Sequence, residues 1–542
     1  MITTLLLIAG FVLDIGLTKA DSRRAQNAAD AAVLAGVLKA SQGTSSMIAE
    51  SRRVATLNGF TTGGSTTVTV NQPPLSGSKV GDASSIEVVI DGVRNTGLSR
   101  IANQQSIPFS VRAVATAKPG STIVGPCGLC IMDRSGITAF HGVHAVAVSN
   151  ANIMVRSTSA GALTMNGGGS MSAQSLIAVR GTPNITGQAT ITPAITSNYA
   201  DFDDPLANLP MPTLSQYHYT ATPANGTTPA GCSGSYSSTI TCSANSSTTY
   251  TFNNGTYNAI SVSGNATANF VTGPSGDTAS KITTLTGSGS TYTINMPGGY
   301  IGSVNVSGTG SVSGIGKTQE IGDVSVGGSV TFSPGTGTFT TIDVTSNGNV
   351  NLQPGYYLGS TSNTTAINEH GSGTVNLASG RYYFGGDFTL YGNTTTTGTN
   401  ILLYFGCRTN GTLRNCNSNG GSGEAGSVFG LSGNSSTRFT GRTSADNTYS
   451  GFFLIYDRNN TSGLTVNGVN PINPTTSGTI YALRALVTMN GMQSVALPIK
   501  SAMVVGRITL NGTGDIKLNF DQTVNADVTI SVPGQAGSIL EE

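Results

Sequence analysis

The sequence predicts a mainly β protein, a parallel β-helix (β-solenoid) rod preceded by a long N-terminal apolar helix and a small α+β module. Residues 1–12 form an apolar run with few interruptions, and an alanine-rich segment follows it. From Thr122 onward, short alternating strands end in Asn-Gly, Ser-Gly or Gly-Gly. Charged residues make up only 9% of the 542 residues, against about 25% in ordinary soluble domains. Regular apolar alternation in such a chain favours repetitive β-structure over disorder.

The first 40 residues predict one long packing helix. Its apolar residues are Leu5, Leu6, Leu7, Ile8, Phe11, Val12 and Leu13. Its small residues at i, i+3, i+4 spacing are Ala25, Ala28, Ala32 and Ala35, which leave one face nearly bare for a neighbouring helix. A membrane span needs about 20 apolar residues, and the run to Leu17 is slightly shorter, so we expect a helix half in lipid and half out. A cleaved signal peptide and an ordinary core helix are the alternatives.

Two stretches of this segment resemble the N-terminal region of the TadE/TadG-like Flp (Tad) pilus assembly proteins. They are Val12-Leu-Asp-Ile-Gly16 and Arg24-Ala-Gln-Asn-Ala-Ala-Asp-Ala-Ala-Val-Leu-Ala-Gly36. The resemblance implies an exported, pilin-like subunit. Its helix would lie in the membrane during assembly and then pack against other pilin-like subunits or copies of itself.

Residues 41–120 are expected to form a pilin-like α+β module. A helix is predicted over 46–57, strands over 66–70 and 85–90, a short helix over 96–102 and a strong strand over 107–117. The sequence Lys118-Pro-Gly-Ser121 marks the exit from this module.

Residues 121–542 are expected to form the parallel β-helix. A pentad, x-Thr-x-Asn-Gly, occurs at 163–167, 464–468, 487–491 and 508–512. Repeats of about 20–30 residues with short strands are typical of solenoids, in which each turn covers its neighbour. An immunoglobulin-like array would repeat at about 100 residues. Inserted loops are predicted near 201–231, which holds five prolines, and near 408–447. Residues 204–212 resemble a linker of long TadG-like proteins.

Six cysteines form three pairs that are close in sequence: Cys127/Cys130, Cys232/Cys242 and Cys407/Cys416. The last two pairs would close short loops as disulfides, which indicates an oxidising, exported setting. For Cys127 and Cys130 a zinc site is the alternative, since His141 and His144 follow nearby.

The sequence contains no recognisable catalytic motif, and we expect no enzyme, cofactor or metal. The acidic cluster Asp201-Phe-Asp-Asp204 favours a linker over a calcium loop. A net charge of +1 gives no reason to expect nucleic acid as a partner. We therefore predict a membrane-anchored or pilus-associated cell-surface protein whose rod serves adhesion or filament building, with surface glycans as further partners. The alternatives are a polysaccharide-binding or polysaccharide-cleaving β-helix and a flat ice-binding face built from threonine rows.

Overall fold

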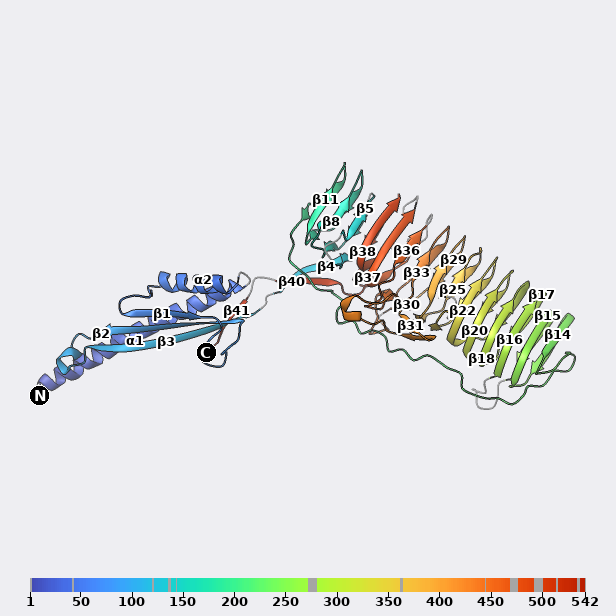
Figure 1. The fold of residues 1–542 in the computed structure, drawn as a ribbon, viewed down its shortest axis with the longest axis horizontal. Coiled ribbons are helices and arrows are strands. Elements are labelled where there is room, and N and C mark those ends of the chain that lie inside the picture. Colours follow the sequence, from blue (N-terminus) through green and yellow to red (C-terminus); the bar gives the residue numbers. More distant parts are fainter. Residues whose placement is uncertain are drawn as a thin grey trace. The chain divides into compact units, whose positions relative to one another are not determined.

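The computed structural model describes residues 2–40, 43–118, 121–134, 138–142, 144–271, 280–360, 364–443, 445–467, 476–491, 501–512, 515–533 and 537–541. The chain forms two compact units (Figure 1). Unit 1 comprises Met1–Ile123 together with Ser531–Glu542, and unit 2 comprises Val124–Ile530. Unit 2 is therefore inserted into the sequence of unit 1. The last residues, predicted from the sequence to belong to the β-helix, are instead part of unit 1.

Unit 1 is an α+β module with a four-stranded antiparallel sheet in the order β1-β2-β3-β41. Its elements are α1 (Ile2–Val37), α2 (Thr44–Leu57), β1 (Thr66–Asn71), β2 (Ser85–Asn95), the 3-10 helix η2 (Ser99–Ala102), β3 (Ser106–Lys118) and β41 (Gly537–Glu541). Strand β41 pairs with β3, with Ala115 opposite Leu540. The C-terminal strand thus completes the sheet that the N-terminal residues begin.

The second half of α1 forms the core of unit 1 with this sheet. Because alternate residues of a strand point to the same face, β2 and β3 each present a row of small or branched apolar side chains. The buried residues of this core include Ala25, Ala28, Ala29, Ala32, Val33, Val37, Ile86, Val88, Ile90, Val111, Ala113 and Ala115. Three of the four alanines predicted to receive a neighbouring helix, Ala25, Ala28 and Ala32, are therefore covered within unit 1.

Glycine at position 36 allows α2 to lie close to α1. A Cβ atom at Gly36 would come 2.1 Å from Ser51 Oγ and 3.0 Å from the carbonyl oxygen of Met47. Both partners belong to α2. The glycine that ends the family-like stretch therefore has a packing role.

Unit 2 is a β-solenoid of parallel strands. The first group of elements is β4 (Ser121–Ile131), β5 (Phe140–Gly142), β6 (Val146–Ser149), β7 (Asn152–Val155), β8 (Ala160–Met165), β9 (Ser170–Ser172), β10 (Ile177–Val179), β11 (Thr182–Ile185), β12 (Thr190–Thr192) and β13 (Ile195–Thr196). The second group, after a long irregular segment, is β14 (Thr239–Phe252), β15 (Thr256–Phe270), β16 (Ser280–Ser288), β17 (Ser290–Asn295), β18 (Gly299–Val306), β19 (Thr309–Ser313), β20 (Thr318–Val326), β21 (Thr331–Ser333), β22 (Thr336–Val344), β23 (Asn349–Leu352), β24 (Gly355–Tyr357), β25 (Thr365–Glu369), β26 (Thr374–Leu377), β27 (Gly380–Phe384), β28 (Asp387–Leu390), β29 (Thr395–Gly398), β30 (Ile401–Phe405), β31 (Cys407–Thr409), β32 (Thr412–Arg414), η3 (Asn419–Gly421), β33 (Phe429–Leu431), β34 (Ser436–Phe439), β35 (Phe452–Tyr456), β36 (Leu464–Asn467), β37 (Gly478–Gly491), β38 (Ser501–Gly512), β39 (Ile516–Asn519) and β40 (Thr529–Pro533).

Apolar side chains stack in columns inside the coils. One column follows the strand pairings from coil to coil through Ile240, Ile260, Leu285, Val304, Val324, Ile342, Ile367 and Phe388. Each of these side chains is at most 2% exposed. Since every coil buries the apolar row of the next, the core is continuous along the solenoid.

The coils do not stack in the order of the sequence. Strand β38 pairs with β4 and β5, and β39 pairs with β6, so the C-terminal coil lies against the N-terminal one. The spatial order therefore begins at β14, runs to β38 and continues through β4, β7 and β10. This order explains the pentads: Leu464, Val487 and Ile508 are aligned, Phe140 follows Ile508, and Leu163 follows Phe140.

An irregular segment, residues 197–224, leads from β13 toward β14, which begins at Thr239; we call it the strap. Along its length it hydrogen-bonds to successive coils, which holds it against the solenoid. Its pairs are Asp201 and Asp203 with Arg156, Asp204 with Tyr481, Leu206 and Leu209 with Arg458, Pro210 with Tyr449, Ser215 with Tyr356, Tyr217 with Thr338, Tyr219 with Glu320, and Pro223 with Thr256. After Arg156, the numbers of these partners fall as the strap numbers rise, and the one departure is Gln216, which donates to the carbonyl oxygen of Leu413 in the β31–β32 hairpin. The strap thus runs back along the coils toward β14.

The inserted loop predicted over 408–447 is shorter in the structure. Strands β33 and β34 lie within that range and pair with the coil strands β28 and β29. The irregular residues of that range lie between β30 and β33, where β31 and β32 form a small antiparallel hairpin, and after β34.

Candidate assembly site

The N-terminal half of α1 exposes a continuous apolar surface. Its exposed side chains include Ile8, Phe11, Val12, Leu13, Ile15 and Leu17, which range from 41% to 64% exposed. An amphipathic helix of a monomeric domain normally buries such residues. A large exposed apolar patch marks an interaction surface.

One narrow stripe of the same helix faces inward. It contains Gly10, Asp14 and Thr18 at i, i+4 spacing, all of which are buried. A Cβ atom at Gly10 would come 2.6 Å from Cβ of Leu98, so the residues before η2 lie directly on the helix. The stripe therefore attaches α1 to the segment that leads into η2.

Asp14 makes this attachment specific. Its carboxylate accepts hydrogen bonds from the backbone N–H groups of Gly97 at 3.0 Å, Leu98 at 3.1 Å and Ser99 at 2.8 Å. These donors lie at the start of η2 and would otherwise lack partners within that short helix. The bond from Ser99, followed by the one from Gly97, lowers the pKa of Asp14 to about 2. Asp14 is therefore ionised at neutral pH.

Two further contacts continue the attachment. Arg94, at the end of β2, forms an ion pair with Asp21 of α1. Gln26 donates a hydrogen bond of 3.1 Å to the carbonyl oxygen of Arg112 on β3. The helix is thus held from Gly10 onward while its apolar side remains exposed.

The sheet beneath the helix has its own buried ion pair. Glu87 is 1% exposed and accepts hydrogen bonds from Ser76, Asn71 and the Nε of Arg112, at 2.6, 2.8 and 2.6 Å. Burial raises the pKa of Glu87, but these hydrogen bonds outweigh that effect and lower it to about 2. The pair fixes the loop after β1 to strands β2 and β3.

The residues predicted to mediate assembly differ in their exposure. Ile8, Phe11, Val12 and Leu13 are exposed, and Ala35 is half-buried. The side chains of Leu5, Leu6 and Leu7 lie outside the described residues. The role of Asp14 was not predicted from the sequence, although a polar residue at i+4 from a glycine within an apolar run was a usable signal. In the described part of α1 and α2, no stretch is sufficiently long and apolar to cross a membrane.

Residues 1–42 match the family "Putative Flp pilus-assembly TadE/G-like". The match covers the exposed apolar surface, Asp14 and Gly36. No curated protein and no solved structure matches the chain. The resemblance drawn from the sequence is confirmed, in a long form that carries a β-solenoid. A TadE/G-like N-terminal segment with such a rod fits a pilus-associated surface protein.

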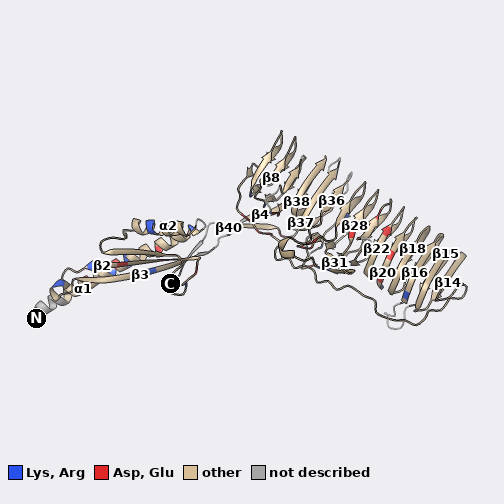
Figure 2. Ribbon diagram, viewed as in Figure 1, with Lys and Arg blue, Asp and Glu red and all other residues tan. Residues whose placement is uncertain are grey.

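Three disulfides join the cysteine pairs that the sequence indicated: Cys127–Cys130, Cys232–Cys242 and Cys407–Cys416. They are consistent with an extracellular location. Among the residues that the structure describes, no three His, Cys, Asp or Glu side chains are grouped to hold a metal ion. In Figure 2, most of the ribbon of unit 2 carries no charged residue.

The acidic cluster at the start of the strap has a structural role. Asp201 and Asp203 accept hydrogen bonds from Arg156 at 3.0 and 2.7 Å. Asp204 accepts one from the hydroxyl of Tyr481 at 2.7 Å. These carboxylates therefore fasten the strap to the coils, in keeping with the linker role expected from the sequence.

Proposed function

We propose that the protein is a pilin-like subunit of a Tad-type pilus system, which assembles through the exposed apolar half of α1 and displays its solenoid outside the cell. The partner surface is the equivalent apolar helix of other pilin-like subunits or of copies of this chain. Before assembly, the same side chains rest in the lipid bilayer. The solenoid then serves adhesion or filament building without a catalytic role.

The observation that supports this proposal is an apolar surface on a helix whose orientation is fixed. Burial of a Leu, Ile or Phe side chain contributes about 1.5–3 kcal/mol. Covering Ile8, Phe11, Val12 and Leu13 against a neighbour therefore gives a strong driving force. The Asp14 attachment keeps this side of the helix outward, so little conformational entropy is lost on assembly.

The test is the double substitution Val12→Asp and Leu13→Asp in the native host. Charges on this surface should prevent its burial, and the protein should leave the pilus fraction and appear in the medium. The matched control is Leu57→Asp with Leu75→Asp, two positions of unit 1 that are each 71% exposed. Retention of the first variant in the pilus fraction, with the control behaving as wild type, would refute the proposal.

The absence of a catalytic role is tested separately. The full chain should release no reducing ends or unsaturated products from a panel of acidic and neutral polysaccharides. Release that depends on the dose of purified protein would favour the β-helix enzyme instead.

A further inference from the structure

We infer that unit 2 binds an acidic saccharide in an arginine-lined groove beside the strap. The groove has a volume of about 510 Å³. Small-molecule sites usually measure about 300–1,000 Å³. Its charged lining consists of Asp133, Arg134, Arg156, Asp204, Arg484 and Arg507. This concentration is unusual in a chain with only 9% charged residues.

The arginines gather because the coils are stacked out of sequence order. Strand β38 pairs with β4, with Val505 opposite Ile131, so Arg507 lies beside Asp133. Strand β4 in turn pairs with β7, with Ile131 opposite Val155, which brings Arg156 to the next coil at the same corner. The site therefore combines residues from both ends of the unit 2 sequence, and no local motif reveals it.

Most of these guanidinium groups have carboxylate partners within the protein. Arg156 bonds to Asp201 and Asp203 of the strap, and Arg507 Nε lies 3.0 Å from Asp133 Oδ2. The side chain of Arg134 is 54% exposed, and one of its terminal nitrogens lies 3.3 Å from an oxygen of each of the two strap carboxylates, Asp201 and Asp203. Its hydrogen bonds are long for a charged pair, so it can turn toward a ligand at small cost.

Arg484 is different. Among the described residues, no carboxylate lies within ion-pair distance of it. Its Nε is buried without a hydrogen-bond partner, as is the Nε of Arg507, which has the carboxylate of Asp133 beside it. One of its terminal nitrogens donates to the carbonyl oxygen of Gly421. A buried donor without a partner is costly, and a bound anion would satisfy it. Arg484 is thus the expected anchor for a negative charge.

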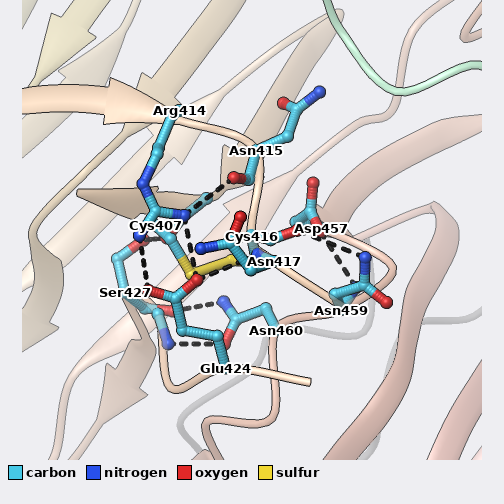
Figure 3. Close-up of a disulfide and its surroundings, with 12 residues drawn as sticks. Cys407, Arg414, Asn415, Cys416, Asn417, Glu424, Ser427, Asp457, Asn459 and Asn460 are labelled. Carbon is cyan, nitrogen blue, oxygen red and sulfur yellow. Dashed lines mark hydrogen bonds and ion pairs between the residues drawn. A yellow bond between two sulfur atoms is a disulfide. The ribbon is translucent and has the colours of Figure 1, made fainter. Parts of the chain in front are cut away.

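The loop that carries Gly421 and Ser422 forms a firm wall of the groove. Figure 3 shows its support: the disulfide Cys407–Cys416, and Arg414 directed at Glu424 through two hydrogen bonds of 2.9 and 2.6 Å. The Glu424 carboxylate also accepts the N–H of Asn417 at 2.9 Å. Because the wall is held before binding, ordering it costs little free energy.

The lining indicates the chemistry of the ligand. A guanidinium group binds a carboxylate or sulfate through paired hydrogen bonds. Ser422 and Thr461 add hydroxyl groups, and Asp133 and Asp204 add acceptors, to the same lining. A ligand that carries one anionic group and several hydroxyl groups would match the guanidinium groups, the hydroxyl groups and the carboxylate acceptors of this lining. A sugar unit of an acidic polysaccharide, such as a uronate, has this composition. A neutral sugar would leave Arg484 without a partner.

The test is isothermal titration calorimetry of the full chain with trigalacturonate, maltotriose as a neutral trisaccharide, and sodium sulfate. We expect binding of trigalacturonate, no detectable binding of maltotriose, and weaker binding of trigalacturonate as salt screens the charges. Arg484→Gln should weaken that binding at least about tenfold, since hydrogen bonds between charged groups are strong. The matched control Arg438→Gln, at an exposed position of β34 outside the groove, should bind like wild type.

A second variant guards against misfolding of the first. Ser422→Trp places a large side chain at an exposed loop position of the groove lining and should block trigalacturonate while the melting temperature stays unchanged. The inference is overturned if wild type fails to bind trigalacturonate, if both groove variants bind it normally, or if sulfate binds as tightly, which would make this a site for inorganic anions only. None of these results depends on assembly through α1.

Discussion

The carboxylate of Asp14 accepts a hydrogen bond of 2.8 Å from the backbone N–H of Ser99, which lies 85 residues further along the chain. Through this bond and two neighbouring ones, a single side chain in the apolar half of α1 determines which side of the helix faces the module. The apolar side chains on the remaining sides stay exposed. Predictions about assembly and stability therefore begin with this contact.

Replacing Asp14 by Ala should lower the melting temperature of unit 1, because three N–H groups at the start of η2 lose their acceptor. Hydrogen exchange of the Gly97, Leu98 and Ser99 amides should become faster in the same variant. Asp91→Asn, at an exposed carboxylate of β2, is the matched control and should change neither quantity. Unchanged exchange in Asp14→Ala would contradict the assigned role.

Acidification should weaken unit 1 in a defined pH range. The folded-state pKa values of Asp14 and Glu87 are both about 2, below the ordinary values of 3.8 and 4.5. A lowered pKa means that the stabilisation is complete above the unfolded-state pKa and is lost as the pH falls through the folded-state pKa. Thermal unfolding followed from pH 5 to pH 2 should show the loss between about pH 4.5 and pH 2. The combined variant Asp14→Asn with Glu87→Gln should flatten this dependence.

Two glycines of α1 should respond in opposite ways to alanine. At Gly36, the new Cβ would meet Ser51 Oγ at 2.1 Å, so Gly36→Ala should destabilise unit 1 by about 1–3 kcal/mol through overpacking. At Gly16 no atom lies within 4 Å of a new Cβ, so Gly16→Ala should stabilise the helix by up to about 1 kcal/mol. Urea denaturation measures both. Addition of Ser51→Gly should partly restore the Gly36→Ala variant if the close contact is the cause.

The strap should come loose when its anchoring arginine is removed. Arg156 is 7% exposed and holds Asp201 and Asp203. In Arg156→Ala, these carboxylates lose their closest partner and keep only the longer contacts with Arg134 and, for Asp201, with Arg180. Limited proteolysis should then cleave the strap near residues 201–212 more rapidly. The solenoid should keep its β-type circular dichroism, because the coils bury their own core. Arg438→Ala serves as the control, and equal cleavage of the two variants would argue against the anchoring role.

The repeat architecture was accessible from the sequence, whereas the order of the coils was not. Short alternating strands and the Thr-x-Asn-Gly pentads indicate a solenoid, since they reflect what every coil must bury. The pairing of β38 with β4 leaves no such sign, because coils of similar composition can stack on one another in any order. For the same reason, the arginine groove, which brings Arg507 next to Asp133, could not be derived from sequence spacing.

In the N-terminal segment, too, some features could be predicted from the sequence and others could not. The exposed Val12 and Leu13 follow from the apolar run and its resemblance to a known family. The burial of the alanines against the sheet does not follow from the sequence, because a helix face of small side chains fits an adjacent sheet as well as another helix. The partners of Asp14 could not be found either, since they are backbone groups of a distant short helix. What decides these cases is tertiary packing within unit 1.

The last prediction concerns the C-terminal strand, which belongs to the sheet of the N-terminal module. Deleting residues 534–542 removes β41 and leaves the edge of β3 from Val114 to Lys118 without its partner strand. The sheet then has three strands, and the backbone groups along that edge become solvated. Calorimetry should show a lower unfolding temperature for unit 1 and little change for unit 2, whose coils are intact. Because α1 packs on this sheet, the truncated protein should also enter the pilus fraction less efficiently, although its apolar surface is unaltered. If the truncation instead lowers the stability of unit 2 alone, β41 has no part in the module, and the assignment of the C-terminal residues to unit 1 fails.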